Sequence, residues 1–285
     1  MEYKIIKTKK RTIYAPDMEL KKKQRAVLKV IKQVFKLNYC IKDCAKVHTN
    51  QKWIVKTDIK NFYESVSEIQ IKDVINRIYA NFENDSIPYN KEEMYAICTL
   101  NGKLPTGAVT SSYIANMVLE PIDIKIKNYC KIRKINYSRY MDDIFFSGAD
   151  KNKLRHAEIF TAKLLKENGF KQNDSKTKYI TTNRRQNILG LVVNNKTAKL
   201  PQKEKRKFRA IFYNYLRATS QEQKEKVVPL KKLDFDTVNG YLSYIRSVDS
   251  EFYNSMKIYI RYNISVMQIN KNKEIKRLLK SIYWH

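Results

Sequence analysis

The sequence predicts an α+β fold in which strands and helices alternate over the first 200 residues and helices alone make up the rest. Two observations indicate this division: alternating or aromatic-rich runs occur before Pro201, and the segments after it have helical spacing. The chain of 285 residues contains 6 Gly and 6 Pro and no internal repeat, so we expect a compact, mostly regular structure. We therefore expect two domains, 1–200 and 201–285.

The first half of the chain alternates helices with one strand. Pro16 and Asp17 precede a predicted helix over 18–37, whose apolar residues recur at helical spacing. Residues 53–58 alternate apolar and polar side chains, which predicts a strand that ends on Asp58. The segments that follow are, in chain order, a helix over 69–78, a polar loop over 81–90, a turn over 104–107 and a long helix over 108–129 with a bend at Pro121.

Residues 136–148 contain two runs rich in Tyr, Ile and Phe on either side of the adjacent acids Asp142 and Asp143. Such residues favour strands, so the stretch predicts a hairpin with Met141 and the two acids at or near its turn. Two like charges this close raise one pKa unless a cation compensates them, and hard oxygen ligands suit Mg²⁺ or Mn²⁺. Asp is also a common turn residue, so the pair alone fits an ordinary surface turn equally well.

The chain after the hairpin is expected to begin with a helix over 150–168, closed by Gly169 in the C′ position. Short strands are expected over 177–181 and 188–193. The helical segment that begins after Pro201 has apolar residues on one face, namely Phe208, Ile211, Phe212 and Tyr215.

The composition indicates a polyanionic partner. The chain has 57 Lys plus Arg against 28 Asp plus Glu, a net charge of +29, and such an excess repels itself unless nucleic acid or another polyanion is bound. The basic residues are spread over the whole chain and no segment approaches a span of about 20 apolar residues, so we expect no membrane partner. Residues 1–11 lack the apolar core of a secretory signal, and four cysteines indicate a reducing, cytoplasmic location.

Asp58 becomes informative beside the hairpin. A strand-terminal Asp next to Asp142 and Asp143 would complete a three-carboxylate site of the kind that supports two-metal phosphoryl transfer. A strand-terminal Asp is also common as a cap, so Asp58 by itself is weak support.

Ordered motifs strengthen this hypothesis. Residues 58–66 have the sequence DIKNFYESV, 104–111 LPTGAVTS, 140–143 YMDD and 169–177 GFKQNDSKT; RTIYAP at 11–16 precedes them and NGYLSYI at 239–245 follows. Together, and in this order, they resemble the motifs of reverse transcriptases, most closely the bacterial retron-type branch. The resemblance implies a right-hand polymerase with fingers and palm in 1–200 and a helical thumb, which binds RNA, in 201–285.

The resemblance also implies roles for individual residues. Asp58 and Asp142 would bind two Mg²⁺ ions (Mn²⁺ is possible), Asp143 would assist, and Lys176 would act as general acid for pyrophosphate release. Lys176 is otherwise an ordinary solvated lysine. The residues implied to bind the deoxynucleotide triphosphate are Arg11, Asn61, Phe62, Tyr63, Thr106 and Gly107.

Within this set, Tyr63 matches the bulky residue that excludes a ribose 2′-hydroxyl, although without the motif it is an ordinary core aromatic. Asn61 and Phe62 would offer backbone N–H groups to the triphosphate, and Arg11 would grip it from the fingers. Thr106 departs from the family, which usually has Gln there, so the details of nucleotide selection differ from the family pattern.

The retron branch is supported by two partial matches. Residues 43–48 resemble the NAxxH element, where Ala45 and His48 fit and Cys44 replaces Asn, and residues 187–194 keep only Gly190 of the VTG stretch. Other bacterial defence-associated reverse transcriptases are therefore the near alternative. Cys40, Cys44 and His48 lack the fourth ligand of a zinc site.

RNA contacts are expected at the start of the helical appendage, where basic residues are dense over 199–209. A solvated helix face is the ordinary interpretation of such a run. The candidate RNA-binding residues are His48, Lys203, Arg206, Lys207 and Arg209.

These observations favour an RNA-directed DNA polymerase that binds a structured noncoding RNA as template and primer and copies part of it into DNA. The resemblance implies retron msDNA synthesis in antiphage defence, with deoxynucleotides as substrates and a separate effector protein. One alternative is a template-independent or protein-primed defence polymerase, which would need no cognate RNA. The other is a catalytically silent RNA-binding protein on a palm fold, against which the intact Asp58, Asp142 and Asp143 argue.

Overall fold

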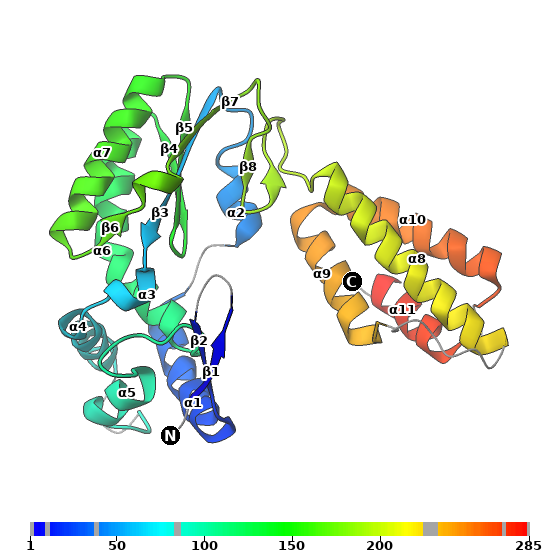
Figure 1. The fold of residues 1–285 in the computed structure, drawn as a ribbon, viewed down its shortest axis with the longest axis horizontal. Coiled ribbons are helices and arrows are strands. Elements are labelled where there is room, and N and C mark those ends of the chain that lie inside the picture. The colour runs from blue at the N-terminus through cyan, green and yellow to red at the C-terminus, as the bar shows by residue number, and fades with distance from the viewer. Residues whose placement is uncertain are drawn as a thin grey trace. The chain divides into compact units, whose positions relative to one another are not determined.

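The computed structural model describes residues 3–8, 12–36, 40–82, 87–224, 233–269 and 272–283. The chain forms two compact units (Figure 1). The first consists of Met1–Cys40 with Gln51–Arg184, and the second of Ile41–Asn50 with Arg185–His285.

An antiparallel sheet forms the centre of the first unit. Its strands run in the order β4 (Asn136–Tyr140), β5 (Asp143–Gly148), β3 (Trp53–Lys60) and β6 (Lys171–Gln172), and β7 (Lys178–Thr181) also pairs with β3. All of these pairings are antiparallel. The predicted strand, hairpin and antiparallel arrangement are therefore confirmed, and β3 extends two residues past Asp58.

Two long helices pack along this sheet (Figure 1). They are α6 (Ser111–Ile132) and α7 (Lys151–Glu167), and the Tyr129 and Phe160 rings stack between them with centroids 4.0 Å apart. Ile126, Leu154 and Phe146 lie in one buried cluster with these helices, and burial of this apolar surface holds the sheet in place. The helix predicted over 150–168 is confirmed, with Asp150 as its N-cap. Gly169 occupies the C′ position with φ +82°, as predicted.

The remainder of the first unit is mostly helical. It contains the hairpin β1 (Tyr3–Lys7) with β2 (Thr12–Pro16), and the helices α1 (Met18–Val34), α3 (Phe62–Ser65), α4 (Glu68–Tyr79) and α5 (Lys91–Cys98). Asp17 caps α1, and reciprocal bonds of Ser67 with Gln70 cap α4. The helix predicted over 69–78 is confirmed, whereas the one predicted over 18–37 ends at Val34, because Phe35 adopts an extended conformation.

The turn before α6 is longer than the sequence predicts. Gly107 has φ +109°, and a Cβ atom there would lie 2.8 Å from Ile13 Cγ2 and 3.0 Å from the Tyr14 carbonyl oxygen. The Tyr14 amide also donates to the Thr106 carbonyl at 2.7 Å. The close approach of β2 therefore holds this turn, and α6 begins at Ser111 instead of residue 108.

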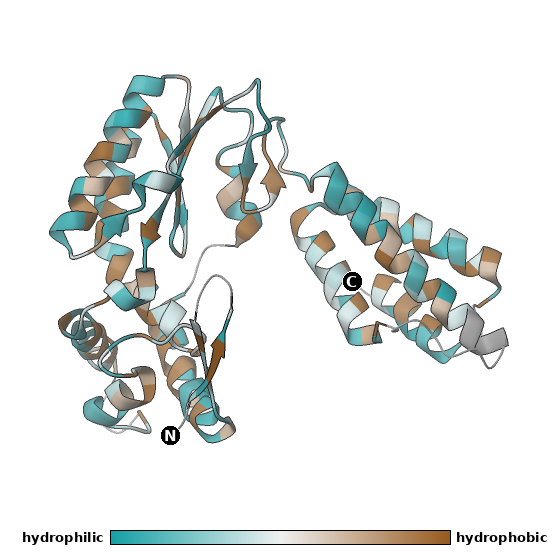
Figure 2. Cartoon of the chain, in the orientation of Figure 1, coloured by the Kyte–Doolittle hydropathy of each residue, from teal (hydrophilic) through white to brown (hydrophobic). Residues whose placement is uncertain are grey.

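Within its described residues, the second unit combines one short helix and a small hairpin with four longer helices. These are α2 (Ile41–Lys46), β8 (Asn187–Ile188), β9 (Leu191–Val192), α8 (Gln202–Lys224), α9 (Phe235–Val248), α10 (Ser250–Met267) and α11 (Lys273–Tyr283). Phe208, Phe212 and Tyr215 of α8 are buried, as their common face predicts. Figure 2 shows hydrophobic positions recurring along these helices between hydrophilic ones.

One expectation needs correction here. The segment 188–193 is not one strand, because Leu189 and Gly190 both have positive φ and reverse the chain between β8 and β9. The second compact unit includes residues 185–200 together with 41–50, since the Asn50 amide donates to the Val193 carbonyl at 2.9 Å. The division into a polymerase core of 1–200 and a thumb of 201–285 stays a prediction. No helix in the described ranges combines the length and hydropathy that a membrane span requires.

Candidate active site

The two acids on neighbouring strands face each other. Asp58 on β3 pairs in register with Asp143 on β5, and Asp142 lies between β4 and β5 at the hairpin turn. The Ile59 amide donates to the Asp142 carbonyl at 3.0 Å, so the turn is bonded to β3 beside Asp58. Residues separated by about 85 positions in the chain are thereby brought together by strand pairing alone.

Two lysines neutralise these acids. Lys176, in the 3₁₀ turn Asp174–Lys176, places its Nζ 2.5 Å from Asp58 Oδ2, and Lys56 Nζ lies 3.1 Å from Asp143 Oδ1. Asp58 is 5% exposed, and its Oδ1 is buried with no hydrogen-bond partner among the residues that the structure describes. A buried carboxylate oxygen without a partner is costly unless a cation or a hydrogen-bond donor occupies its neighbourhood.

The carboxyl of Asp142 reaches solvent but is crowded by protein atoms. This desolvation raises the pKa of Asp142, the charges of Asp143 and Asp58 raise it further, and a backbone hydrogen bond and Lys176 oppose the shift. The hydrogen bond to Asp58 in turn raises the pKa of Lys176, which keeps its ammonium charged at neutral pH. The site therefore contains a carboxylate whose ionisation is disfavoured in the absence of an added cation.

The carboxylate oxygens of these three acids are chemically suited to bind a divalent cation. Three carboxylates, one with an unpartnered buried oxygen, match the hard oxygen ligands that Mg²⁺ and Mn²⁺ prefer. Across the ranges described, no three His, Cys, Asp or Glu side chains already stand close enough to hold a metal ion. Asp58 and Asp143 are instead directed toward Lys176 and Lys56.

The residues predicted to contact the nucleotide follow β3 directly. Asn61 has φ 48° in the left-handed region and is the N-cap residue of α3. Phe62 is buried, and Tyr63 is partly buried with its ring centroid 5.3 Å from that of Phe62. Thr106 and Gly107 lie in the turn before α6, where Gly107 is exposed. Arg11 lies outside the described residues.

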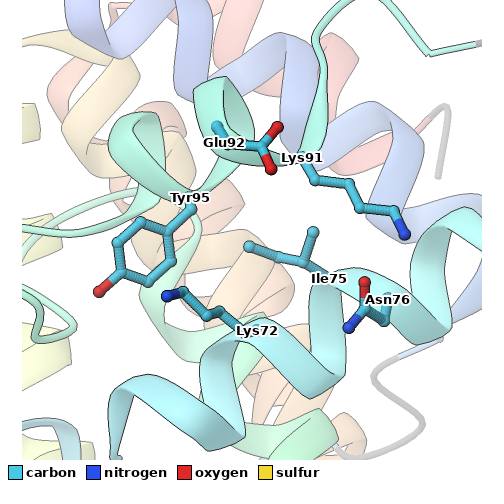
Figure 3. Close-up of a pocket in the computed structure, with 6 residues that line it drawn as sticks. All are labelled: Lys72, Ile75, Asn76, Lys91, Glu92 and Tyr95. Carbon is cyan, nitrogen blue, oxygen red and sulfur yellow. The ribbon is translucent and has the colours of Figure 1, made fainter.

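A pocket of about 380 Å³ lies between α4 and α5 and holds none of the predicted site residues (Figure 3). Its lining residues are Lys72, Ile75, Asn76, Lys91, Glu92 and Tyr95. It is separate from the acids of β3 and β5.

In the second unit, the predicted RNA-binding residues of α8 are solvent-exposed: Lys203, Arg206, Lys207 and Arg209. His48 is different, because its side chain is 0% exposed and burial lowers its pKa to about 3. The imidazole belongs to the interior of the second unit, so the predicted RNA contact of His48 is corrected.

Sequence reasoning missed Lys56 and Arg139. Lys56 precedes Asp58 by two positions, so strand alternation places both on one face and offered a signal. Arg139 gave no comparable signal, because its partner Asp123 lies on α6 and only the packing of α6 beside β4 joins them.

Acids on adjacent antiparallel strands, backed by two helices, define the palm of a right-hand polymerase. The fold is similar to that of apo telomerase from Candida tropicalis, with a TM-score of 0.52, 11% identity, and coverage of 99% of this chain and 63% of that chain. Telomerase from Candida albicans in complex with a fragment of telomeric RNA gives a TM-score of 0.51 and 13% identity, with coverage of 99% and 65%. At this identity the likeness concerns the fold.

The family model of reverse transcriptase (RNA-dependent DNA polymerase) matches residues 4–193, and the chain belongs to this family. The retron Ec86 reverse transcriptase of Escherichia coli is 26% identical over 262 residues, covering 88% of this chain and 75% of the relative. The retron Ec83 enzyme of the same species is 24% identical over 277 residues, covering 88% and 84%. The expected retron-type affiliation and right-hand polymerase fold are confirmed, and reverse transcriptases use divalent metal ions.

Proposed function

We propose that this protein copies part of a structured noncoding RNA into DNA by two-metal nucleotidyl transfer, as the msDNA synthesis of a retron, and serves antiphage defence with a separate effector protein. The observation that carries the proposal is the cross-strand pair of Asp58 and Asp143 with Asp142 at the adjoining turn. The unpartnered buried Oδ1 of Asp58 supports a cation at this point.

The three acids would bind the two metal ions in different ways. Asp58 and Asp142 would each contact both, and Asp143, paired with Lys56, would assist. Bound Mg²⁺ or Mn²⁺ supplies a lowered pKa for the attacking hydroxyl and charge neutralisation for the leaving pyrophosphate. The raised pKa of Asp142 supports this role, because such a carboxyl gains most from a nearby cation.

Lys176 would donate a proton to the leaving pyrophosphate. Its ammonium is held protonated by Asp58, and its side chain is 65% exposed, so it can move toward a substrate oxygen. The neighbouring loop would select the deoxynucleotide: Tyr63 would exclude the ribose 2′-hydroxyl by volume. Backbone amides of Asn61 and Phe62 would meet the triphosphate. Arg11 would grip the triphosphate, and Thr106 with Gly107 would border the incoming nucleotide.

The exposed basic residues of α8 would hold the RNA by its phosphates, and the net charge of +29 supports a polyanion partner. We expect a reducing cytoplasm as the compartment, because four cysteines in a chain of 285 residues do not suggest a disulfide framework.

The proposal is tested by expressing the protein from its native operon, purifying it and sequencing the nucleic acid bound to it. Wild-type protein is expected to carry a joined RNA–DNA species, and the Asp142→Asn, Asp143→Asn variant to carry RNA alone. DNA made without any template in the operon would favour a template-independent polymerase. If both proteins carry only RNA, and no added template and nucleotide give DNA, a silent RNA-binding protein replaces the polymerase.

A further inference from the structure

A buried ion pair lies directly beneath the turn that carries Asp142. Arg139 is 5% exposed and Asp123 is 6% exposed. The Arg139 Nε donates to both carboxylate oxygens at 3.0 Å, and its Nη2 donates to Oδ2 at 2.5 Å. The Tyr137 hydroxyl donates to Oδ1 of the same carboxylate at 2.5 Å. Asp123 therefore fixes the plane of the guanidinium.

The remaining guanidinium nitrogen reaches the turn itself. Arg139 Nη1 donates to the Met141 carbonyl at 2.7 Å and to Asn116 Oδ1 at 2.6 Å. The Met141 carbonyl belongs to the peptide bond that joins Met141 to Asp142. Asn116 completes the arrangement, since its Nδ2 lies 3.1 Å from Met141 Sδ.

The backbone at this turn needs such support. Met141 has φ 55°, in the left-handed region that a long side chain rarely adopts, and strained conformations persist only where surrounding contacts enforce them. A charge-assisted hydrogen bond to the Met141 carbonyl orients the following peptide unit and hence the direction in which Asp142 leaves the backbone.

We infer that Arg139, held by Asp123 and Asn116, is the positioning residue that aims Asp142 toward the metal ions of the proposed polymerase site. The inference rests on the proposed function, because it concerns the same acids. Burying a charge is costly, and a buried ion pair often adds little net stability to the folded state. Stability alone therefore does not account for a buried guanidinium that bonds to the turn. Partners of this kind behind metal ligands typically change metal affinity by about 10–100-fold when they are altered.

Arg139→Lys is the decisive variant. Lysine keeps the charge opposite Asp123 but has a single nitrogen, which cannot bind the carboxylate in two places and also reach Met141 and Asn116. We expect the dissociation constant for Mn²⁺, titrated on the RNA-free protein, to rise by about 10-fold or more, with a matching rise in the Mg²⁺ needed for half-maximal incorporation. The KM for the template is expected to stay unchanged.

The matched control is Arg77→Lys. Arg77 also binds a carboxylate of α6, with Nη2 2.5 Å from Glu120 Oε2, and it also donates to a backbone carbonyl, that of Met117. It has no contact with the turn at Met141 among the interactions described. The Mn²⁺ affinity of the Arg77→Lys variant is expected to equal that of the wild type.

Asn116→Ala serves as a second variant, because it leaves the ion pair intact if Arg139→Lys does not fold. It is expected to weaken Mn²⁺ binding in the same direction, with unfolding temperature as the check on folding. Mn²⁺ affinity equal to the wild type in a folded variant overturns the inference. If the wild type binds Mn²⁺ but incorporates no nucleotide, the polymerase proposal fails while the titration still decides the role of Arg139. Mn²⁺ binding that is insensitive to Asp142→Asn overturns both.

Discussion

The negative charges around the turn at Met141 are only partly compensated by nearby lysines. Lys176 and Lys56 each pair with one acid, whereas Asp142 has an opposing lysine only at longer range and its pKa is raised by desolvation and by its neighbours. Functional sites commonly hold such unfavourable charges, because the ligand that relieves them is also the one they bind. The first prediction follows from this imbalance.

Asp142→Asn should stabilise the metal-free protein at pH 7. A carboxyl whose pKa is raised on folding disfavours the folded state once it is ionised, so the penalty is complete above the folded pKa and absent below the ordinary value of 3.8. Because the side chain reaches solvent, we expect an increase in unfolding temperature of no more than about 3 °C. Thermal unfolding in the presence of a chelator, with and without the substitution, measures it.

The gain should shrink toward zero as the pH falls below the ordinary carboxyl pKa of 3.8, where the wild-type carboxyl is protonated in both the folded and the unfolded state. Added Mg²⁺ should reverse the order, since it stabilises only the protein that keeps the ligand. If the wild type and the Asp142→Asn variant unfold at the same temperature at pH 7, the unfavourable charge described for Asp142 is contradicted.

Strand pairing decides whether the acids meet. The register that sets Asp58 opposite Asp143 also sets Trp53 opposite Gly148, so one register holds over residues 53–58 of β3 and all of β5. A slip of one residue would turn every side chain to the other face. Phe146 packs in the core cluster that contains Leu154 of α7, whereas the Phe145 ring lies under Lys56, so a slip would disrupt the packing of both rings.

The exposed face of α8 yields a prediction about salt. Replacing all four basic residues with Ala should weaken RNA binding and reduce the slope of log affinity against log salt concentration by about 3. The residues are Lys203, Arg206, Lys207 and Arg209. Filter binding over a range of salt concentrations, with the cognate RNA, gives the slope.

Four exposed lysines of α6 and α7 provide the control for that experiment, namely Lys125, Lys127, Lys131 and Lys163. Their joint replacement removes the same charge and should change the slope by less. An equal effect of both replacements would indicate general attraction to a basic protein instead of a binding face on α8.

At the scale of the whole molecule, the charge of +29 predicts how stability responds to salt. Without RNA, like charges repel in the folded state, and raising NaCl from about 0.05 to 0.5 M should raise the unfolding temperature by screening them. With RNA bound, the same salt increase weakens the complex and should therefore lower the unfolding temperature. Calorimetry of both forms tests this opposition, and a salt response of the same sign in both would contradict it.

The sequence by itself determined the family, the positions of the acids and most helices, because motif order, capping residues and apolar spacing are local properties. The hairpin at Met141, the cap at Asp150 and the Gly169 stop all follow from neighbouring residues. Helix ends at Val34 and Ser111 were displaced from prediction, since Phe35 turns to an extended conformation and β2 approaches Gly107.

Only the tertiary structure decided which charges share a site. The ion pair of Arg139 with Asp123 joins β4 to α6, and no pattern in the sequence indicates it. His48 shows the same limit, because its match to the NAxxH element did not reveal that packing buries its side chain completely. Contacts between distant segments decide how far a titratable side chain is removed from water and which charged groups lie beside it, and these two factors set its pKa.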